Sequence, residues 1–162
     1  MKTLLTILLF GLWTLATGVD TPIIKKYKIT DLETYISTAD HPVVVSFWAT
    51  FCTPCIKEIP YLQNSVKDHQ QEGVELMLVS LDRIRDFPDG IARFAREHGY
   101  HATLVWLDER DTRYFCPRID KGWTGGMPAS LFVNNKTGYR RFYDRQLTDL
   151  QVGPAIREMI AH

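Results

Sequence analysis

The sequence predicts an α/β domain with a central mixed β-sheet flanked by helices on both faces. Apolar, β-branched runs alternate with amphipathic helical patterns over most of the chain, which is typical of parallel strands joined by helices. Two strand patterns joined by a short polar loop then predict an antiparallel hairpin at the sheet edge. A last helical pattern follows the hairpin, so both faces of the sheet can be covered.

The first half of the chain supplies the alternation. Thr30 and Glu33 have the spacing of a capping box, which predicts a helix over 31–39. The following elements are expected in this order: a buried strand over 43–49, a helix over 52–71 ended by Gly73, a buried strand over 74–81, and a helix over 89–99 ended by Gly99.

The second half supplies the hairpin and the final helix. The expected elements are a strand over 103–107, a short helix over 108–116 halted by Pro117, strands over 129–133 and 139–143 joined by a loop over 134–138, and a helix that begins at the Thr148–Gln151 capping box and ends near His162. No change in composition marks a second domain.

Composition indicates one folded domain of ordinary type. The 162 residues carry a formal net charge of zero and are 45% hydrophobic, enough to bury a core without disulfides. A neutral chain is not expected to bind nucleic acid or an anionic membrane as its main partner. We expect a monomer.

The amino terminus differs from this average. Lys2 precedes an apolar run of about a dozen residues and then small residues, the pattern of a signal peptide cleaved after Gly18. An uncleaved membrane anchor and a buried core helix are the alternatives. We therefore divide the chain into residues 1–18 as signal peptide or anchor and 19–162 as a single domain. The protein is expected to be exported to the periplasm, soluble after cleavage or tethered by this segment.

The cysteines of the mature domain are Cys52, Cys55 and Cys116. Cys52 follows a buried strand and begins a helix, where unsatisfied N–H groups and the helix dipole favour a thiolate. Two intervening residues bring Cys52 and Cys55 within bonding distance on one helical turn. The spacing predicts a redox pair in which Cys52 attacks and Cys55, one turn deeper, resolves the mixed disulfide.

Two other interpretations of this pair are weaker. A structural zinc site needs four ligands, and neither Cys116 nor the five histidines show the spacing of a second ligand pair. An inert disulfide that closes so short a loop would stabilise the fold little. No metal and no cofactor beyond the redox-active disulfide are therefore expected. Cys116 is expected to be a small buried hydrophobe or, alternatively, a redox partner of the pair or the site of an intermolecular link.

Glu58 lies three residues past Cys55, at the border of an apolar helical stripe. The stripe is expected to contain Ile56, Ile59, Leu62 and Val66. Partial burial would raise the pKa of Glu58, so that its carboxyl group could exchange a proton with Cys55. The alternative is an ordinary surface glutamate.

Three motifs together carry a family resemblance. The stretch "FWATFCTPC", the following "KEIP" and the downstream "GGMPASLFV" resemble the exported TlpA-like/ResA-like thiol-disulfide oxidoreductases, which have a thioredoxin fold. The resemblance covers residues 27–162. It implies that Cys52 is the nucleophile, that Cys55 is the resolving cysteine, and that the two form the redox-active disulfide.

The same resemblance implies a substrate-binding group. Pro128 would be a cis-proline facing the pair, Met127 would present backbone groups to an extended client segment, and Trp48 would pack beside the site. Cytosolic thioredoxins carry a buried aspartate where this chain has Ser46, whereas the TlpA-like group has a glutamate at the position of Glu58. The exported subgroup is therefore favoured.

These observations predict a thiol-disulfide oxidoreductase that reduces disulfides of exported client proteins. A membrane-bound thiol reductant is expected to recharge the pair, since an oxidising compartment has no thiol buffer. The alternatives are a reductase for cytochrome c maturation, a thiol peroxidase, and a non-catalytic peptide-binding domain. The peroxidase pattern places a threonine three residues before the reactive cysteine, where this chain has Ala49.

Overall fold

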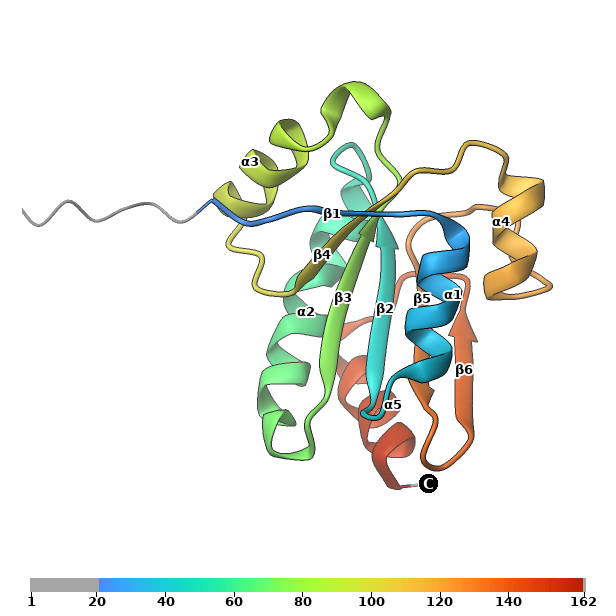
Figure 1. The fold of residues 1–162 in the computed structure, drawn as a ribbon. Coiled ribbons are helices and arrows are strands. Elements are labelled where there is room, and N and C mark those ends of the chain that lie inside the picture. Colours follow the sequence, from blue (N-terminus) through green and yellow to red (C-terminus); the bar gives the residue numbers. More distant parts are fainter. Residues whose placement is uncertain (1–20, 162) are drawn as a thin grey trace, which may run out of the picture.

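The computed structural model describes residues 21–161, which form three layers with a β-sheet in the middle (Figure 1). The strand order is β1-β4-β3-β2-β5-β6, and the strands are β1 (Lys25–Tyr27), β2 (Val43–Trp48), β3 (Glu75–Ser80), β4 (Thr103–Leu107), β5 (Ala129–Asn134) and β6 (Tyr139–Tyr143). Strands β1 to β4 run parallel, whereas β5 and β6 add an antiparallel hairpin. The predicted mixed sheet is confirmed.

Five helices in the described part cover the two faces: α1 (Ile29–Thr38), α2 (Thr53–Asp68), α3 (Asp89–Glu97), α4 (Thr112–Ile119) and α5 (Asp149–Ala161). Residues of α1 and α4 share one apolar core with the sheet, and residues of α2, α3 and α5 share the other. Side chains alternate along the strands, so Val44 faces one core while Val43 and Val45 face the other. Every residue of β2 is buried, as its apolar sequence predicts for a central strand.

Several element boundaries differ from the sequence-based expectation. Helix α1 begins two residues earlier than expected, because Asp31, rather than Glu33, accepts a hydrogen bond from the backbone N–H of Lys28 at 2.8 Å. Helix α2 ends at Asp68, and a separate 3-10 turn at Gln70–Glu72 leads to Gly73 in the left-handed conformation. Strand β1 was not predicted, because three half-polar residues at a sheet edge carry no periodic pattern.

The expectation that Pro117 halts a helix was wrong. Helix α4 begins at Thr112 and continues through Pro117 to Ile119. A proline removes only the one hydrogen bond to the residue four positions earlier. In this short helix the Asp120 N–H still donates to the Cys116 carbonyl at 3.0 Å, so the last turn closes.

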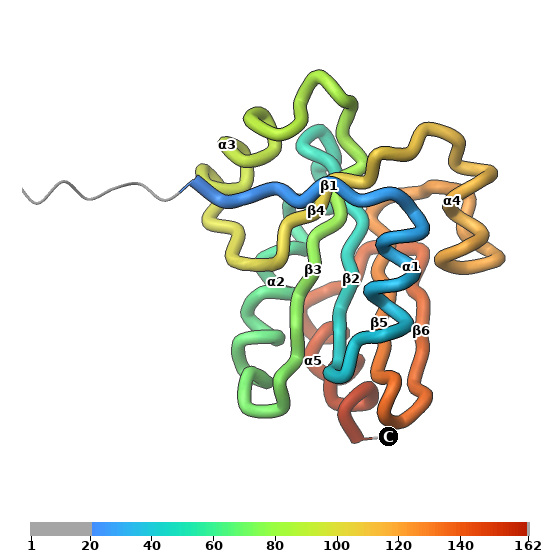
Figure 2. Tube along the Cα trace, viewed as in Figure 1, coloured from blue at the N-terminus to red at the C-terminus, as the bar shows by residue number. Residues whose placement is uncertain are grey.

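The register of the sheet brings distant segments to one edge. Phe47 pairs with Ala129, so the residue before Ala129 lies level with the end of β2. Trp48 pairs with Ser80, so the loops that leave β2 and β3 emerge side by side. Figure 2 shows these loops together at one end of the sheet, beside the start of α2. We call this end the carboxyl edge.

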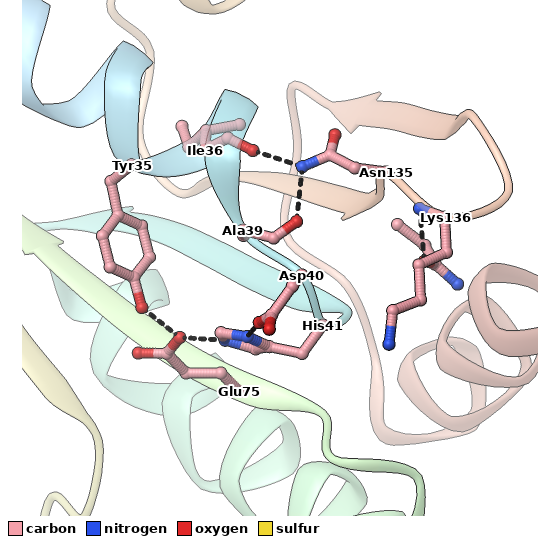
Figure 3. A network of polar contacts seen from close by, with 9 residues as sticks. Tyr35, Ile36, Ala39, Asp40, His41, Glu75, Asn135 and Lys136 are labelled. Carbon is pink, nitrogen blue, oxygen red and sulfur yellow. Dashed lines mark hydrogen bonds and ion pairs between the residues drawn. The ribbon is translucent and has the colours of Figure 1, made fainter.

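A polar network lies at the opposite end, which we call the amino edge (Figure 3). Glu75 accepts hydrogen bonds from Tyr35, from His41 Nε2 at 2.7 Å and from Thr103 Oγ1 at 2.5 Å. Separately, the Asn135 side chain of the β5–β6 loop donates to two carbonyls at the end of α1, at 2.8 and 2.9 Å. These bonds join α1 to the β5–β6 loop and to strands β3 and β4, and they join β3 to the segment before β2.

The predicted signal peptide or anchor at 1–18 lies outside the described residues. Among residues 21–161, none of the helices is long and apolar enough to cross a bilayer.

Candidate active site

The Cys-Thr-Pro-Cys sequence occupies the junction of β2 and α2 at the carboxyl edge. Cys52 is the N-cap residue of α2, and its sulfur accepts a hydrogen bond from the Cys55 N–H at 3.3 Å. Pro54 lies in the first helical turn, where a missing N–H removes no helical bond. The sequence therefore places one sulfur at the positive end of the helix dipole.

A disulfide joins Cys52 and Cys55. Cys52 keeps 7% of its surface exposed, whereas Cys55 is fully buried. Cys52 is therefore the cysteine of the pair that another molecule can reach. Phe51, directly before it, is 66% exposed and stands at the molecular surface beside the pair.

Asp82, in the loop after β3, holds the turn that carries Cys52. Its carboxylate accepts from the Thr50 N–H at 3.1 Å and from the Thr50 hydroxyl at 2.6 Å. The Ser80 hydroxyl donates to the same carboxylate at 2.8 Å. Because Asp82 is buried, these bonds are sheltered from water and fix the turn firmly to β3. No motif in the sequence pointed to Asp82, and only its position directly after a buried strand could have indicated it.

Pro128 lies at the same edge, level with the end of β2. The Met127–Pro128 peptide bond is cis, as the resemblance implied. Pro128 is buried and Met127 is half-buried against the core that contains both cysteines. The Trp123 indole N–H donates to the Gly126 carbonyl at 2.9 Å, which fixes the loop that leads to this proline.

Gly125 in this loop has a positive φ of 100°. A Cβ atom there would lie 3.0 Å from the Thr112 methyl group and 3.6 Å from the Cys116 sulfur. Both the backbone conformation and the close approach to α4 therefore require glycine. This contact places Cys116 behind the proline loop.

Glu58 is fully buried on the same face of α2 as Cys55. Burial raises its pKa to about 7, although the Leu147 N–H, which donates to Oε1 at 2.7 Å, and the charge of Arg145 both act to lower it. Its second oxygen, Oε2, has no hydrogen-bond partner among residues 21–161. A buried carboxyl with one unpaired oxygen can take up or release a proton near neutral pH. The alternative of a surface glutamate was wrong.

The buried face of α2 is rotated from the expected stripe. Ile59 and Leu62 are buried as expected, but Ile56 and Val66 are only half-buried. Contacts with α5 and the loop before it cover the Glu58 side of the helix instead. Apolar spacing alone could not show this, because it counts a glutamate as solvent-facing.

Trp48 packs in the same core as the pair, as the resemblance implied, and a part in client binding stays a prediction. Its ring is fully buried and contacts Tyr100 edge-on, with centroids 5.3 Å apart, and Phe94 at 5.9 Å. An interior tryptophan supports the wall of the site. Phe51, in contrast, is an exposed aromatic residue next to Cys52.

Cys116 lies in the core on the other face of the sheet from the Cys52–Cys55 disulfide. It is fully buried and forms no disulfide. Burial, aided by the charge of Asp144, raises the pKa of its thiol to about 11. A protonated, inaccessible thiol is a poor nucleophile, so the structure favours a packing role over a redox one.

No three His, Cys, Asp or Glu side chains within residues 21–161 lie close enough together to hold a metal ion. Thiol-disulfide exchange needs only the two sulfurs and a proton acceptor. Reliance on the disulfide alone stays a prediction.

The fold and this site define a class of protein: a thioredoxin-like domain with a Cys-x-x-Cys disulfide at the start of its central helix. Solved structures share the fold. A thioredoxin-related protein from Neisseria meningitidis has a TM-score of 0.59 at 21% identity, covering 77% of this chain and 86% of that one. A thiol-disulfide isomerase from Corynebacterium glutamicum has a TM-score of 0.62 at 17% identity, covering 78% and 84%.

The chain belongs to the AhpC/TSA family, whose sequence profile matches residues 18–136. Two relatives are named thiol-disulfide oxidoreductase ResA. The protein from Oceanobacillus iheyensis is 48% identical over 97 residues, covering 56% of this chain and 43% of the relative. The one from Bacillus subtilis is 29% identical over 110 residues, covering 68% and 53%. The chain thus spans about half the length of these relatives, and the resemblance to ResA-like proteins is confirmed.

Proposed function

We propose that this protein is a thiol-disulfide oxidoreductase that reduces disulfides of exported client proteins. One observation carries the proposal: Cys52 and Cys55 form a disulfide at the start of α2, with only Cys52 reaching the surface. The names of the relatives from Oceanobacillus iheyensis and Bacillus subtilis support the same activity.

The reaction starts from the reduced pair. The Cys52 thiolate attacks one sulfur of the client disulfide, and the other client sulfur leaves as a thiolate that takes up a proton. The Cys55 thiolate then attacks Cys52, releases the second client thiol and forms the disulfide seen in the structure. Two electrons pass from the pair to the client in each cycle.

Glu58 serves the second step as the proton acceptor. Cys55 is buried, so water cannot readily remove its proton. The Glu58 carboxyl lies on the same helical face, and its pKa of about 7 leaves it partly ionised at neutral pH. It accepts the Cys55 proton as the thiolate forms and returns it when the pair is reduced again. Met127 and Pro128 supply the backbone against which a client segment lies.

The partners follow from this chemistry. Disulfide-bearing client proteins are the substrates, and a membrane-bound thiol reductant returns the pair to its dithiol form. The protein acts as an exported monomer in the periplasm, soluble or tethered by residues 1–18, and needs no cofactor besides its disulfide. Peroxide reduction is less favoured, since the Thr50 hydroxyl is bonded to Asp82 rather than directed to a substrate.

Reduction of a peptide disulfide by the dithiothreitol-reduced protein tests the proposal. Wild type and Cys116→Ser should react at equal rates, and Cys52→Ser should be inactive because it lacks the attacking sulfur. Cys55→Ala should accumulate a mixed disulfide on Cys52, visible by mass spectrometry without reductant. An inactive wild type, or equal activity of Cys52→Ser, would show that the proposal is wrong.

A further inference from the structure

The loop after β3 forms a ridge beside the disulfide. The ridge is the 3-10 turn at Ile84–Asp86 together with Arg83 before it. A groove of about 250 Å³ on one side is lined by Phe51, Arg83, Arg85 and Asp86. A second groove of about 450 Å³ shares Arg83 and Arg85 with the first, is also lined by Ile84, and extends to Arg110.

The ridge is held in place from beneath. The Trp106 indole N–H donates to the Asp82 carbonyl at 2.8 Å, directly before the ridge begins. Phe87, directly after it, stacks on the Trp106 ring with centroids 4.5 Å apart. Both ends of the ridge are therefore fixed on one buried tryptophan, so it offers a preformed surface.

The charge that the ridge presents to solvent is positive. Arg83, Arg85 and Arg110 are exposed. Within residues 21–161, Arg83 and Arg110 form no ion pair, and Arg85 lies 3.9 Å from Asp86, a distance at which an exposed pair contributes little. These guanidinium groups remain available for an incoming carboxylate.

The other acidic groups of the larger groove are already engaged. Asp108 lies 3.1 Å from the Lys26 ammonium and 2.9 Å from that of Lys28. Glu109 accepts a hydrogen bond from the Ile29 N–H at 3.1 Å. Asp82, Asp108 and Glu109 equal the three arginines of this groove in number, but they are buried or half-buried and already bonded, so the exposed arginines are the charged groups that this surface presents to solvent.

Apolar side chains accompany the arginines. Ile84 is 54% exposed on the ridge, and exposed Phe51 borders the smaller groove directly before Cys52. Large apolar groups ringed by arginines match a peptide segment that combines apolar and acidic residues. Because Phe51 adjoins Cys52, such a segment would approach the disulfide itself.

We propose that the ridge at Arg83, Ile84 and Arg85 selects client segments that carry acidic residues next to the disulfide cysteine. This inference rests on the proposed function and names its substrate class. The arginines raise the rate of encounter with acidic clients by electrostatic attraction, while Phe51 and Ile84 contact the apolar residues.

Two peptides with the same disulfide loop test the proposal, one flanked by glutamates and one by lysines. At low ionic strength, wild type should reduce the acidic peptide with a kcat/KM about tenfold higher than that of the basic one. Raising the salt to about 0.5 M should remove most of this preference. Hydroxyethyl disulfide, a small neutral substrate, reports the chemistry without docking.

The variant Arg83→Glu/Arg85→Glu should lose or reverse the peptide preference while reducing hydroxyethyl disulfide at the wild-type rate. Its matched control is Arg93→Glu/Arg157→Glu, which changes the net charge equally at exposed positions on α3 and α5. This control should keep the preference.

Three outcomes would overturn the proposal. Equal rates on both peptides, together with reduction of hydroxyethyl disulfide, would agree with the oxidoreductase function but would show that the ridge does not select clients. No reduction of any disulfide would defeat both ideas. Equal peptide rates together with arginine-dependent binding to phosphatidylglycerol vesicles would assign the ridge to a lipid surface instead.

Discussion

A fully buried glutamate, Glu58, and a half-buried one, Glu75, lie at different places in this fold and have opposite properties. Glu58, on α2 near the carboxyl edge, has one backbone donor and an unpaired oxygen, and burial raises its pKa to about 7. Glu75, at the amino edge, is also desolvated, which acts to raise its pKa. However, hydrogen bonds from His41, Thr103 and Tyr35 outweigh that effect and lower it.

The difference shows how one residue type serves two purposes. A carboxylate surrounded by donors stays ionised and joins the elements that supply those donors. A carboxylate buried with a single donor holds its proton more tightly and releases it in the range where thiols react. The number of donors, rather than burial alone, separates a structural glutamate from a proton carrier.

The largest effect on stability is expected for Glu58→Gln in the oxidised protein. The folded pKa of about 7 exceeds the ordinary 4.5, so the folded state binds this proton more tightly than the unfolded chain does. The free energy of unfolding of wild type therefore falls as the pH rises from about 4.5 to above 7, by roughly 3 kcal/mol. Urea unfolding from pH 4 to 9 should show this slope in wild type, whereas the variant should keep only the His41 contribution of less than about 1 kcal/mol.

The same substitution should slow disulfide reduction about 10- to 100-fold, since the resolving thiol loses its proton acceptor. Lys57→Gln, at the exposed neighbouring position, serves as control and should change neither property. A pH slope in Glu58→Gln as large as that of wild type would contradict the assignment.

Glu75→Ala tests whether Glu75 has a structural role. Removing the carboxylate leaves His41, Thr103 and Tyr35 without their shared acceptor, so a loss of about 2 kcal/mol is expected. Urea unfolding near pH 5.5 measures it. The rate of disulfide reduction should stay at the wild-type value, because the network lies at the far end of the sheet. A slower reaction with unchanged stability would reverse the roles assigned to the two glutamates.

Asp82→Asn is expected to have a smaller effect. An amide keeps one acceptor oxygen but turns an NH₂ group toward the donors on Thr50 and Ser80, at a cost of about 1 kcal/mol. The turn that carries Cys52 should loosen, and peptide-disulfide reduction should slow several-fold. Asp68→Asn, at an exposed position at the end of α2 and without these bonds, is the control. Equal rates for the two variants would show that Asp82 does not position the turn.

The strand–turn–helix segment that carries Cys52 was predictable because its determinants are local. An apolar run, a capping position and the two-residue spacing all lie within a dozen residues of one another. The hairpin and the order of elements followed equally from neighbouring residues. Such short-range patterns predict local structure without knowledge of contacts to distant residues.

Asp82 and the ridge were missed because their function depends on contacts distant in sequence. Asp82 bonds to Thr50, 32 positions away. The ridge is fixed by Trp106, which lies on another strand. The rotation of α2 that buries Glu58 likewise depends on Leu147. The pattern of one segment does not indicate which distant residues it will contact. The Cys-Thr-Pro-Cys motif could therefore be predicted, but most of the residues that pack around it could not.

The smallest effect concerns His41 and sharpens the comparison. Hydrogen bonds to Asp40 and Glu75 raise the His41 pKa above its ordinary 6.5. Its contribution to stability is therefore complete below pH 6.5 and is lost as the pH rises through the folded-state pKa. Glu75 acts in the other direction, contributing above about pH 4.5 and losing its effect as the pH falls through its lowered pKa. The network is strongest between these limits.

His41→Gln should remove the alkaline part of this dependence. The expected change is less than about 1 kcal/mol, because His41 is one third exposed and its ion pairs are screened by solvent. Wild-type Glu58 also loses stability as the pH rises, so the comparison is made in a Glu58→Gln background. Urea unfolding between pH 5 and 9 should then show a falling free energy with His41 present and a flat one without it. If the free energy of unfolding still falls with pH after both substitutions, the titrating group lies elsewhere. The amino-edge network would then stabilise the fold without responding to pH.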